Sequence, residues 1–170
     1  MSTAIEMDRR SFIQLLGGGI VVCVSLGPSA LLAQERRRGY PTDFNVYLRI
    51  GEDGRVTVFS GKIEMGQGVL TSQAQMLAED LGVALESVDM VLGDTDRCPW
   101  DMGTFGSLTT RVFGPALRAA AAEARGVLLL LASERLGVPK ERLVVTDGVV
   151  SVRDAPQTKV TYAQLAHGQA

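Results

Sequence analysis

Two Asp-Gly dipeptides, Asp53-Gly54 and Asp147-Gly148, each separate two short runs of mainly apolar residues. Asp-Gly readily adopts the positive φ angles that a tight hairpin turn requires. The sequence therefore predicts one β-hairpin with strands at 44–50 and 56–59. It predicts a second hairpin with strands at 143–145 and 149–152.

Helical patterns lie between and after the hairpins. Residues 69–81 place apolar side chains at helical spacing, and Gly82 is a plausible C-terminal stop. The side chains expected to face the core are Leu70, Ala74, Leu77, Ala78 and Leu81.

A second helical region, rich in alanine and leucine, runs from about 108 to 136. Pro115 should start a helix near its own position or kink a longer one, and Gly137 should end it. A short strand is expected at 88–92, followed by a long loop at 93–106. The order ββαβαββ predicts an α+β fold in which β-hairpins pack with two main helices.

A further helix begins near residues 161–166 and has few residues before the chain ends. A helix of this length is marginal on its own. The sequence is therefore expected to end before the fold is complete.

The N-terminal segment, residues 1–33, has the pattern of an export signal. Arg9-Arg10 is followed by Ser11-Phe12, and the stretch from Leu15 to Leu32 carries no ionised side chain. This pattern is typical of the twin-arginine route, with cleavage after Ala33, and it predicts a periplasmic protein. Residues 34–43 then form a linker, and residues 44–170 form the folded part.

A retained membrane anchor is the alternative interpretation of this segment. The stretch is about long enough to span roughly 30 Å of hydrocarbon, although its glycines and Pro28 weaken a helix. Arg36-Arg37-Arg38 after the stretch keeps this alternative open.

The twin-arginine route carries folded proteins, which favours a cargo that receives a cofactor before export.

Composition excludes several kinds of site. The net charge of −2 gives no indication of nucleic-acid binding. Cys23 lies in the signal, so Cys98 would be left alone, and the sequence contains one histidine, His167. Neither a cysteine cluster nor a multi-histidine metal site can form within this chain.

The segment Met65-Gly66-Gln67-Gly68 lies between a strand and a helix start. Glycines at 66 and 68 permit a sharp turn and close backbone approach to a ligand. The amides of the first helical turn should favour an anionic or electron-rich group there, and Gln67 offers both a donor and an acceptor. An ordinary glycine-rich turn is the alternative. Neither a P-loop nor a dinucleotide fingerprint is present.

A second loop runs through Gly93-Asp94-Thr95 and Pro99 to Gly103-Thr104-Phe105-Gly106-Ser107. Thr104 or Ser107 could cap the following helix. Gly106 would let the backbone approach a ligand. Phe105 would either line a substrate site or pack in the core.

Other candidates are weaker. Asp94, Asp96 and Asp101 could bind a hard cation, but acids in an irregular loop are more often solvated. Cys98 is a possible reactive thiol, and Trp100 is expected to pack or to line an entrance. Glu64 is expected to be solvated or paired.

These segments follow one another in the order seen in molybdenum hydroxylases, the relatives of xanthine dehydrogenase and aldehyde oxidase. The arrangement most resembles the large subunits of the isoquinoline 1-oxidoreductase type, in their N-terminal portion. The resemblance covers about residues 44–136 and rests on Ile63–Thr71, Gln75, Ala78-Glu79, Leu81-Gly82, Asp94-Thr95, Gly103–Ser107, Gly114, Ala116 and Ala119-Ala120.

The resemblance implies a partial molybdopterin-binding domain. Gln67 matches the glutamine beside the molybdenum and the dithiolene, and Gly66 and Gly68 match the glycines that lie against the cofactor. Thr104, Phe105, Gly106 and Ser107 match the loop that passes close to the metal and the pterin. The implied cofactor is a molybdopterin with molybdenum, usually in the cytosine dinucleotide form.

The implied reaction inserts oxygen from water into a C–H bond of an aldehyde or an N-heteroaromatic compound. The implied partners are an iron–sulfur small subunit, often a cytochrome c subunit, and the remainder of the large subunit.

One departure limits the expected activity. The family's general base is a glutamate in a Gly-x-Gly-Glu-like context, and this sequence has no such motif. A base is needed to deprotonate a metal-bound hydroxyl, so the chain alone is expected to be inactive. It would be a fragment, a truncated product or a piece that needs a second chain. A non-catalytic exported α+β binding or assembly module remains the alternative.

Overall fold

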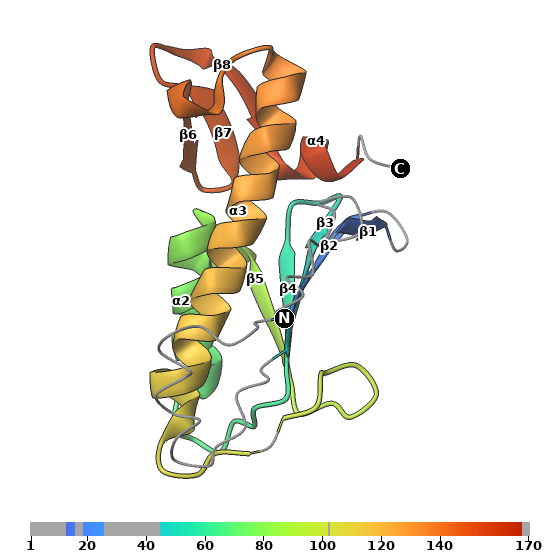
Figure 1. The fold of residues 1–170 in the computed structure, drawn as a ribbon, viewed down its shortest axis with the longest axis vertical. Coiled ribbons are helices and arrows are strands. Elements are labelled where there is room, and N and C mark those ends of the chain that lie inside the picture. Colours follow the sequence, from blue (N-terminus) through green and yellow to red (C-terminus); the bar gives the residue numbers. More distant parts are fainter. Residues whose placement is uncertain (1–12, 16–18, 26–44, 102, 168–170) are drawn as a thin grey trace, which may run out of the picture.

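The computed structural model describes residues 13–15, 19–25, 45–101 and 103–167. Helices α2 and α3 pack side by side and lie beside a five-stranded sheet, and a three-stranded sheet lies near the C-terminal end of α3 (Figure 1). The α+β class predicted from the sequence is confirmed. Arg9-Arg10 and the predicted linker, 34–43, fall outside the described residues.

The first predicted hairpin is present as β3 (Asn45–Gly51) and β4 (Val56–Ser60), which pair antiparallel. The turn closes with a hydrogen bond from the Gly54 amide to the Gly51 carbonyl at 2.9 Å, and Gly54 has a φ of 81°. Alternate residues of β4, beginning with Val56 and Val58, are buried, because successive side chains point to opposite faces of a sheet. The Asp-Gly signal therefore identified this turn correctly.

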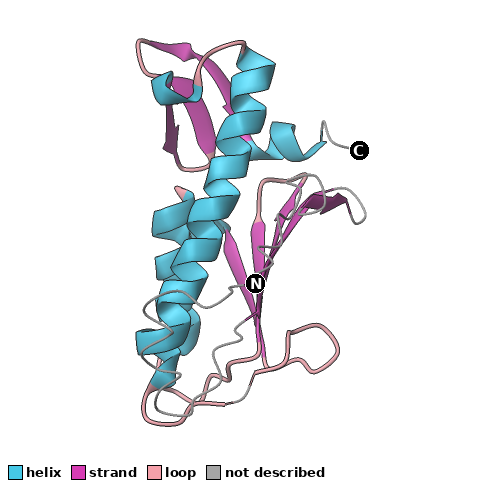
Figure 2. Ribbon diagram, in the orientation of Figure 1, coloured by secondary structure: helices cyan, strands magenta, loops and turns pink. Residues whose placement is uncertain are grey.

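Strand β5 (Val88–Leu92) pairs parallel with β4, after the short 3₁₀ turn η1 (Leu85–Ser87). A parallel pair requires a crossover connection, and here α2 provides it. The carboxyl ends of β4 and β5 consequently lie at the same edge of the sheet. Figure 2 shows the loops that follow these strands at the end of the molecule opposite the three-stranded sheet.

Two further strands lie within the predicted export signal. They are β1 (Ile13–Leu15) and β2 (Gly19–Ser25), and β2 pairs antiparallel with β3 over its whole length. The sequence pattern did not indicate these strands. A run of uncharged apolar residues suits a strand, a leader or an anchor, so pattern alone does not separate the three.

Helix α2 (Val69–Leu81) has the predicted bounds, and Gly82 ends it with a φ of 77°. One expected core residue is wrong, since 45% of Leu70 is exposed. Val69 and Gln73 are buried instead, because the inward face follows the 69-73-77-81 row. Gln73 is polar, so an apolar pattern could not reveal its position.

Helix α3 (Gly114–Leu136) follows one turn of π-helix, η2 (Thr109–Phe113). Pro115 lies in its first turn and Gly137 ends it with a φ of 64°, as predicted. The face toward the rest of the protein is rich in alanine, which lets neighbouring elements approach closely. Its buried alanines are Ala116, Ala120, Ala121, Ala124 and Ala132.

The second predicted hairpin is present as β6 (Leu143–Thr146) and β7 (Val149–Val152), after the 3₁₀ turn η3 (Lys140–Arg142). Strand β8 (Ala155–Thr161), which the sequence analysis missed, pairs with β7. Its side chains are mostly exposed and polar, so it lacks an apolar pattern. Helix α4 (Tyr162–His167) begins close to the predicted position.

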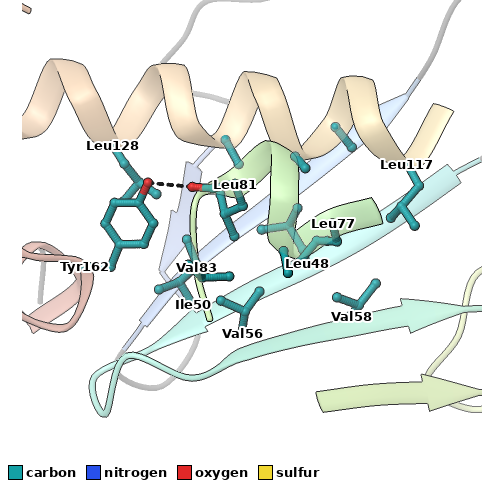
Figure 3. Close-up of a cluster of buried hydrophobic side chains, with 14 of the residues drawn as sticks. Leu48, Ile50, Val56, Val58, Leu77, Leu81, Val83, Leu117, Leu128 and Tyr162 are labelled. Carbon is teal, nitrogen blue, oxygen red and sulfur yellow. Dashed lines mark hydrogen bonds between the residues drawn. The ribbon is translucent and has the colours of Figure 1, made fainter. Parts of the chain in front are cut away.

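Tyr162 ties the start of α4 to the end of α2. Its hydroxyl donates a 2.8 Å hydrogen bond to the carbonyl of Leu81, and its ring lies beside Leu128 (Figure 3). The Gly148 amide donates to the Gly82 carbonyl at 2.8 Å. The second sheet is thus fixed to the C-terminal end of α2. Among the described helices, none combines the length and the apolar character needed to cross a membrane.

Candidate functional site

The loops after β4 and β5 together form a pocket with a volume of about 680 Å³. The first loop contributes Gly61, Lys62, Ile63, Met65 and Gln67. The second loop and the start of η2 contribute Asp101, Gly103, Thr104, Ser107, Thr109 and Thr110. Crevices beyond the carboxyl ends of parallel strands are common ligand sites. The fold therefore brings together the two loops that the sequence singled out.

Three of the seven predicted site residues line this pocket, and the other four do not. Gln67, Thr104 and Ser107 line it. The other four lie in the same two loops, but they are not among its lining residues: Gly66, Gly68, Phe105 and Gly106.

The first loop turns sharply at its two glycines. Gly66 has a φ of 93° and Gly68 a φ of 76°, and a Cβ atom at either position would meet no atom within 4 Å. The backbone conformation, rather than lack of space, therefore favours glycine at both positions.

The Gln67 amide is fixed within its own loop. Its Nε2 donates to the Ile63 carbonyl at 2.7 Å, and its Oε1 accepts from the Met65 amide at 2.6 Å. A glutamine amide carries a second hydrogen and a second lone pair. Gln67 can thus hold its orientation and still offer polar atoms to a ligand.

Glu64 corrects one expectation about this loop. Its carboxylate accepts hydrogen bonds from the amides of Gly66 at 2.7 Å, Gly68 at 3.0 Å and Leu70 at 2.9 Å. The amide of Leu70 lowers the pKa of Glu64 most, and the amides of Gly68, Gly66 and Val69 lower it further. Glu64 is paired, as expected. The amides of this turn, which were predicted to favour an anionic ligand, donate to the carboxylate of Glu64 in this structure.

The second loop also contains backbone in the left-handed region. Gly103, Gly106 and Ser107 have φ values of 102°, 65° and 63°. Neither Thr104 nor Ser107 caps the next helix, since η2 has Leu108 at its N-cap with no side-chain capping bond. Instead the hydroxyls of Thr104 and Thr109 lie 2.9 Å apart.

Phe105 is 57% exposed, which excludes the core-packing alternative for it. A Cβ atom at position 103 would lie 3.1 Å from Cε2 of its ring, so the ring lies against Gly103. Trp100 is 70% exposed and therefore does not pack in the core.

Three lining residues were not predicted from the sequence: Lys62, Thr109 and Thr110. Only 3% of the Lys62 side chain is exposed, and Nζ lies 2.9 Å from Oδ1 of Asp101. A lysine after a strand is usually solvated. Its partner is 39 positions away in the sequence, so no local pattern reveals the pair.

The remaining candidates form no metal site. Asp94 accepts from the amides of Asp96 and Arg97, and Asp101 pairs with Lys62. Within the described ranges, no group of three histidine, cysteine or acidic residues could hold a metal ion. The Cys98 thiol lies 3.3 Å from the Val91 carbonyl.

His167 is distant in the sequence from the residues that line the candidate pocket, and its partner, Glu52, is not one of them either. Its Nδ1 is 3.3 Å from Glu52, and 77% of its side chain is exposed. It therefore takes no part in the site.

The pocket residues fit a polar, anionic cofactor. Gln67, Ser107 and Thr110 bring an amide and two hydroxyls to the lining, and the hydroxyls of Thr104 and Thr109 share one hydrogen bond there. The acid among the lining residues, Asp101, is offset by the Lys62 ammonium.

Comparison with known proteins agrees with this geometry. Residues 3–170 match the model of the molybdopterin cofactor-binding domain family. The chain is 39% identical to a nicotinate dehydrogenase subunit from Pseudomonas putida, over 73% of the chain and 10% of that protein. It is 31% identical to the β subunit of isoquinoline 1-oxidoreductase from Brevundimonas diminuta, over 95% of the chain and 22% of that protein.

A solved structure has the same fold. Quinoline 2-oxidoreductase from Pseudomonas putida 86 superimposes with a TM-score of 0.66 at 27% identity, over 89% of this chain and 19% of that chain. The chain thus spans between a tenth and about a fifth of the length of these proteins. It belongs to the molybdopterin cofactor-binding domain family of the molybdenum hydroxylase large subunits.

Proposed function

We propose that this chain supplies part of the cofactor-contacting surface of an oxidoreductase that hydroxylates aldehydes or N-heteroaromatic compounds. The observation that carries the proposal is the shared pocket, in which Gln67 faces the same space as Thr104 and Ser107. The cofactor would be molybdopterin with molybdenum, in the cytosine dinucleotide form. When bound, it supplies the transfer of oxygen from water and accepts the electrons.

The residues of this chain bind and orient the cofactor in this proposal. Gln67 offers its second amide hydrogen, while Ile63 and Met65 hold the rest of the amide in place. Ser107, Thr109 and Thr110 also line the pocket, and each carries a hydroxyl. Hydrogen bonds to an anionic group are stronger than those between neutral groups, so these donors favour retention of the cofactor.

The general base would come from outside this chain. Asp101 is the carboxylate among the described pocket residues, and Lys62 holds it as an ion pair. This carboxylate is already engaged by its cationic partner inside the protein, so it does not take the role of the base in this proposal. The chain on its own would therefore bind without turning over.

The rim of the pocket supports association with the remainder of a large subunit. Of the lining residues, Ile63 (60%) and Met65 (83%) are exposed, and Trp100 (70%) and Phe105 (57%) are exposed in the second loop. Clustered exposed apolar side chains commonly mark a contact surface. The further partners proposed are an iron–sulfur small subunit and a cytochrome c subunit that receives the electrons.

We also propose that the chain is exported to the periplasm through the twin-arginine route. Arg9-Arg10, the uncharged stretch from Leu15 to Leu32 and Ala33 support this proposal. Cleavage after Ala33 would leave β3 as an edge strand, since β2 pairs with it in the full chain. Replacing Arg9 and Arg10 by lysine should abolish export, and N-terminal sequencing of the exported protein locates the cleavage site.

The test of the cofactor proposal uses the complete complex purified from its native source. Molybdenum is measured by elemental analysis, and CMP is measured after acid hydrolysis. The wild-type complex should contain both, and Gln67→Ala should lower both, because the amide facing the pocket is lost. Gln157→Ala, an exposed change in β8, is the control and should leave both unchanged.

A wild-type complex without molybdenum, or a chain that is a stable metal-free monomer in its native source, would overturn the proposal. The second result would instead support a non-catalytic binding or assembly module.

A further inference from the structure

Lys62 is a buried cation at the junction of the two pocket loops. It lies two residues after the end of β4, and 3% of its side chain is exposed. An ionised amine is almost never buried to this extent without partners, because removing it from water is costly. The structure provides these partners from the opposite loop.

Nζ of Lys62 has polar contacts with Asp101, Gly103 and Thr104 of the second loop. It donates to Oδ1 of Asp101 at 2.9 Å and to the carbonyl of Gly103 at 2.9 Å, and it lies 3.4 Å from Oγ1 of Thr104. Asp101 in turn accepts from the Gly103 amide at 2.7 Å. The side chain of one loop therefore holds both the backbone and a pocket hydroxyl of the other.

The same cation also reaches the base of the following helix. Nζ lies 5.8 Å from the centre of the Phe113 ring, at the end of η2, within the range of a cation–π interaction. Oγ1 of Thr104 is 2.9 Å from Oγ1 of Thr109, in the first position of η2. Lys62 is thus linked to the three segments that line the pocket.

We infer that Lys62 is a positioning residue that fixes the second loop against the first and so sets the shape of the cofactor pocket. The inference rests on the proposed function for the role of the pocket, and on the contacts above for the role of Lys62. Lys62 acts through Asp101, Gly103 and Thr104. Loss of Lys62 should release the second loop while β4 and α2 stay in place.

The experiment compares Lys62→Met, Asp101→Asn and the double variant Lys62→Met/Asp101→Asn with wild type. Removing one partner of a buried pair leaves an unpaired charge, whereas removing both leaves none. The single variants should therefore lower the melting temperature, and the double variant should recover most of it. The second loop loses the Lys62 tether in Lys62→Met and in the double variant, whereas Asp101→Asn keeps the bonds from Lys62 to Gly103 and Thr104.

Two readouts report on the loop itself. In the full chain, hydrogen exchange at the Gly103 amide should rise about tenfold in Lys62→Met and in the double variant, while exchange in α2 stays close to wild type. In the complete complex, loss of molybdenum on dialysis should be roughly 10- to 100-fold faster, as for other residues that orient a metal site indirectly. Arg55→Met, which breaks the exposed Arg55–Asp89 pair, is the control and should change neither readout.

The double variant decides between positioning and simple stability. If it regains both wild-type exchange and wild-type retention of molybdenum, Lys62 contributes only stability and the inference is overturned. If it regains stability but still exchanges and loses metal rapidly, the inference holds. If the wild-type complex carries no molybdenum, the proposed function fails, and the exchange measurement alone decides the role of Lys62.

Discussion

The carboxylate of Glu64 accepts a 2.9 Å hydrogen bond from the backbone amide of Leu70, at the start of α2. Two further amides of the same turn, from Gly66 and Gly68, donate to the other carboxylate oxygen. The first amides of a helix lack partners within the helix. Glu64 supplies the missing hydrogen-bond acceptors from outside the helix. The N-cap residue, Gly68, has no side chain that could accept from these amides.

Glu64→Gln should destabilise the chain at neutral pH, because a neutral amide is a weaker acceptor for these donors. The pKa of Glu64 is lower in the folded state than its usual value of 4.5. Its contribution is therefore complete above pH 4.5 and is lost as the pH falls through the lower folded pKa.

Thermal unfolding of both proteins from pH 7 to pH 2.5 or so measures this dependence. The difference in melting temperature between the two proteins should be largest at neutral pH and should decrease as the pH falls. Glu123→Gln, an exposed change in α3, is the control. A gap that is the same at every pH would show that the ionised carboxylate does not stabilise the turn.

Gly61→Ala should disturb the packing between the two pocket loops. A Cβ atom at position 61 would lie 2.5 Å from Cβ of Asp101 and 2.6 Å from the carbonyl oxygen of Pro99. Neither atom is the end of a flexible side chain, so the second loop must shift. Overpacking of this kind typically costs about 1–3 kcal/mol of the free energy of unfolding, which urea unfolding measures. Stability equal to wild type would show that the loops separate without cost.

Gly82→Ala should destabilise the junction between α2 and the second sheet. Gly82 has a φ of 77°, and a Cβ atom there would lie 2.9 Å from Cγ1 of Val145. Forcing alanine into this conformation costs about 1–3 kcal/mol, in addition to the displacement of Val145. Chemical denaturation of the full chain measures the change.

Gly126→Ala should have the opposite effect on stability, measured by the same chemical denaturation. Gly126 lies inside α3, and a Cβ atom there would meet no atom within 4 Å. Alanine should raise the stability by about 0.5–1 kcal/mol, because it is the better helix former. Equal effects of the two substitutions would contradict the conformational explanation.

Local sequence signals determined much of the framework. The two Asp-Gly turns, the bounds of α2 and β5, and the glycines that end α2 and α3 were all predicted correctly. Each depends on conformational preferences of residues close together in the chain. Where such preferences were weak, prediction failed: β8 has no apolar alternation, and β1 and β2 lie in a stretch that equally suits a leader.

The sequence alone also identified both pocket loops, because their glycines and hydroxyl residues precede helices in a recognisable order. It could not show that the loops meet, because that depends on the parallel pairing of β4 with β5. Nor could it show that Lys62 is buried against Asp101, or that Glu64 takes the amides expected to bind a ligand. Those contacts join groups whose separation is set by the packed fold, so only the tertiary structure decided them.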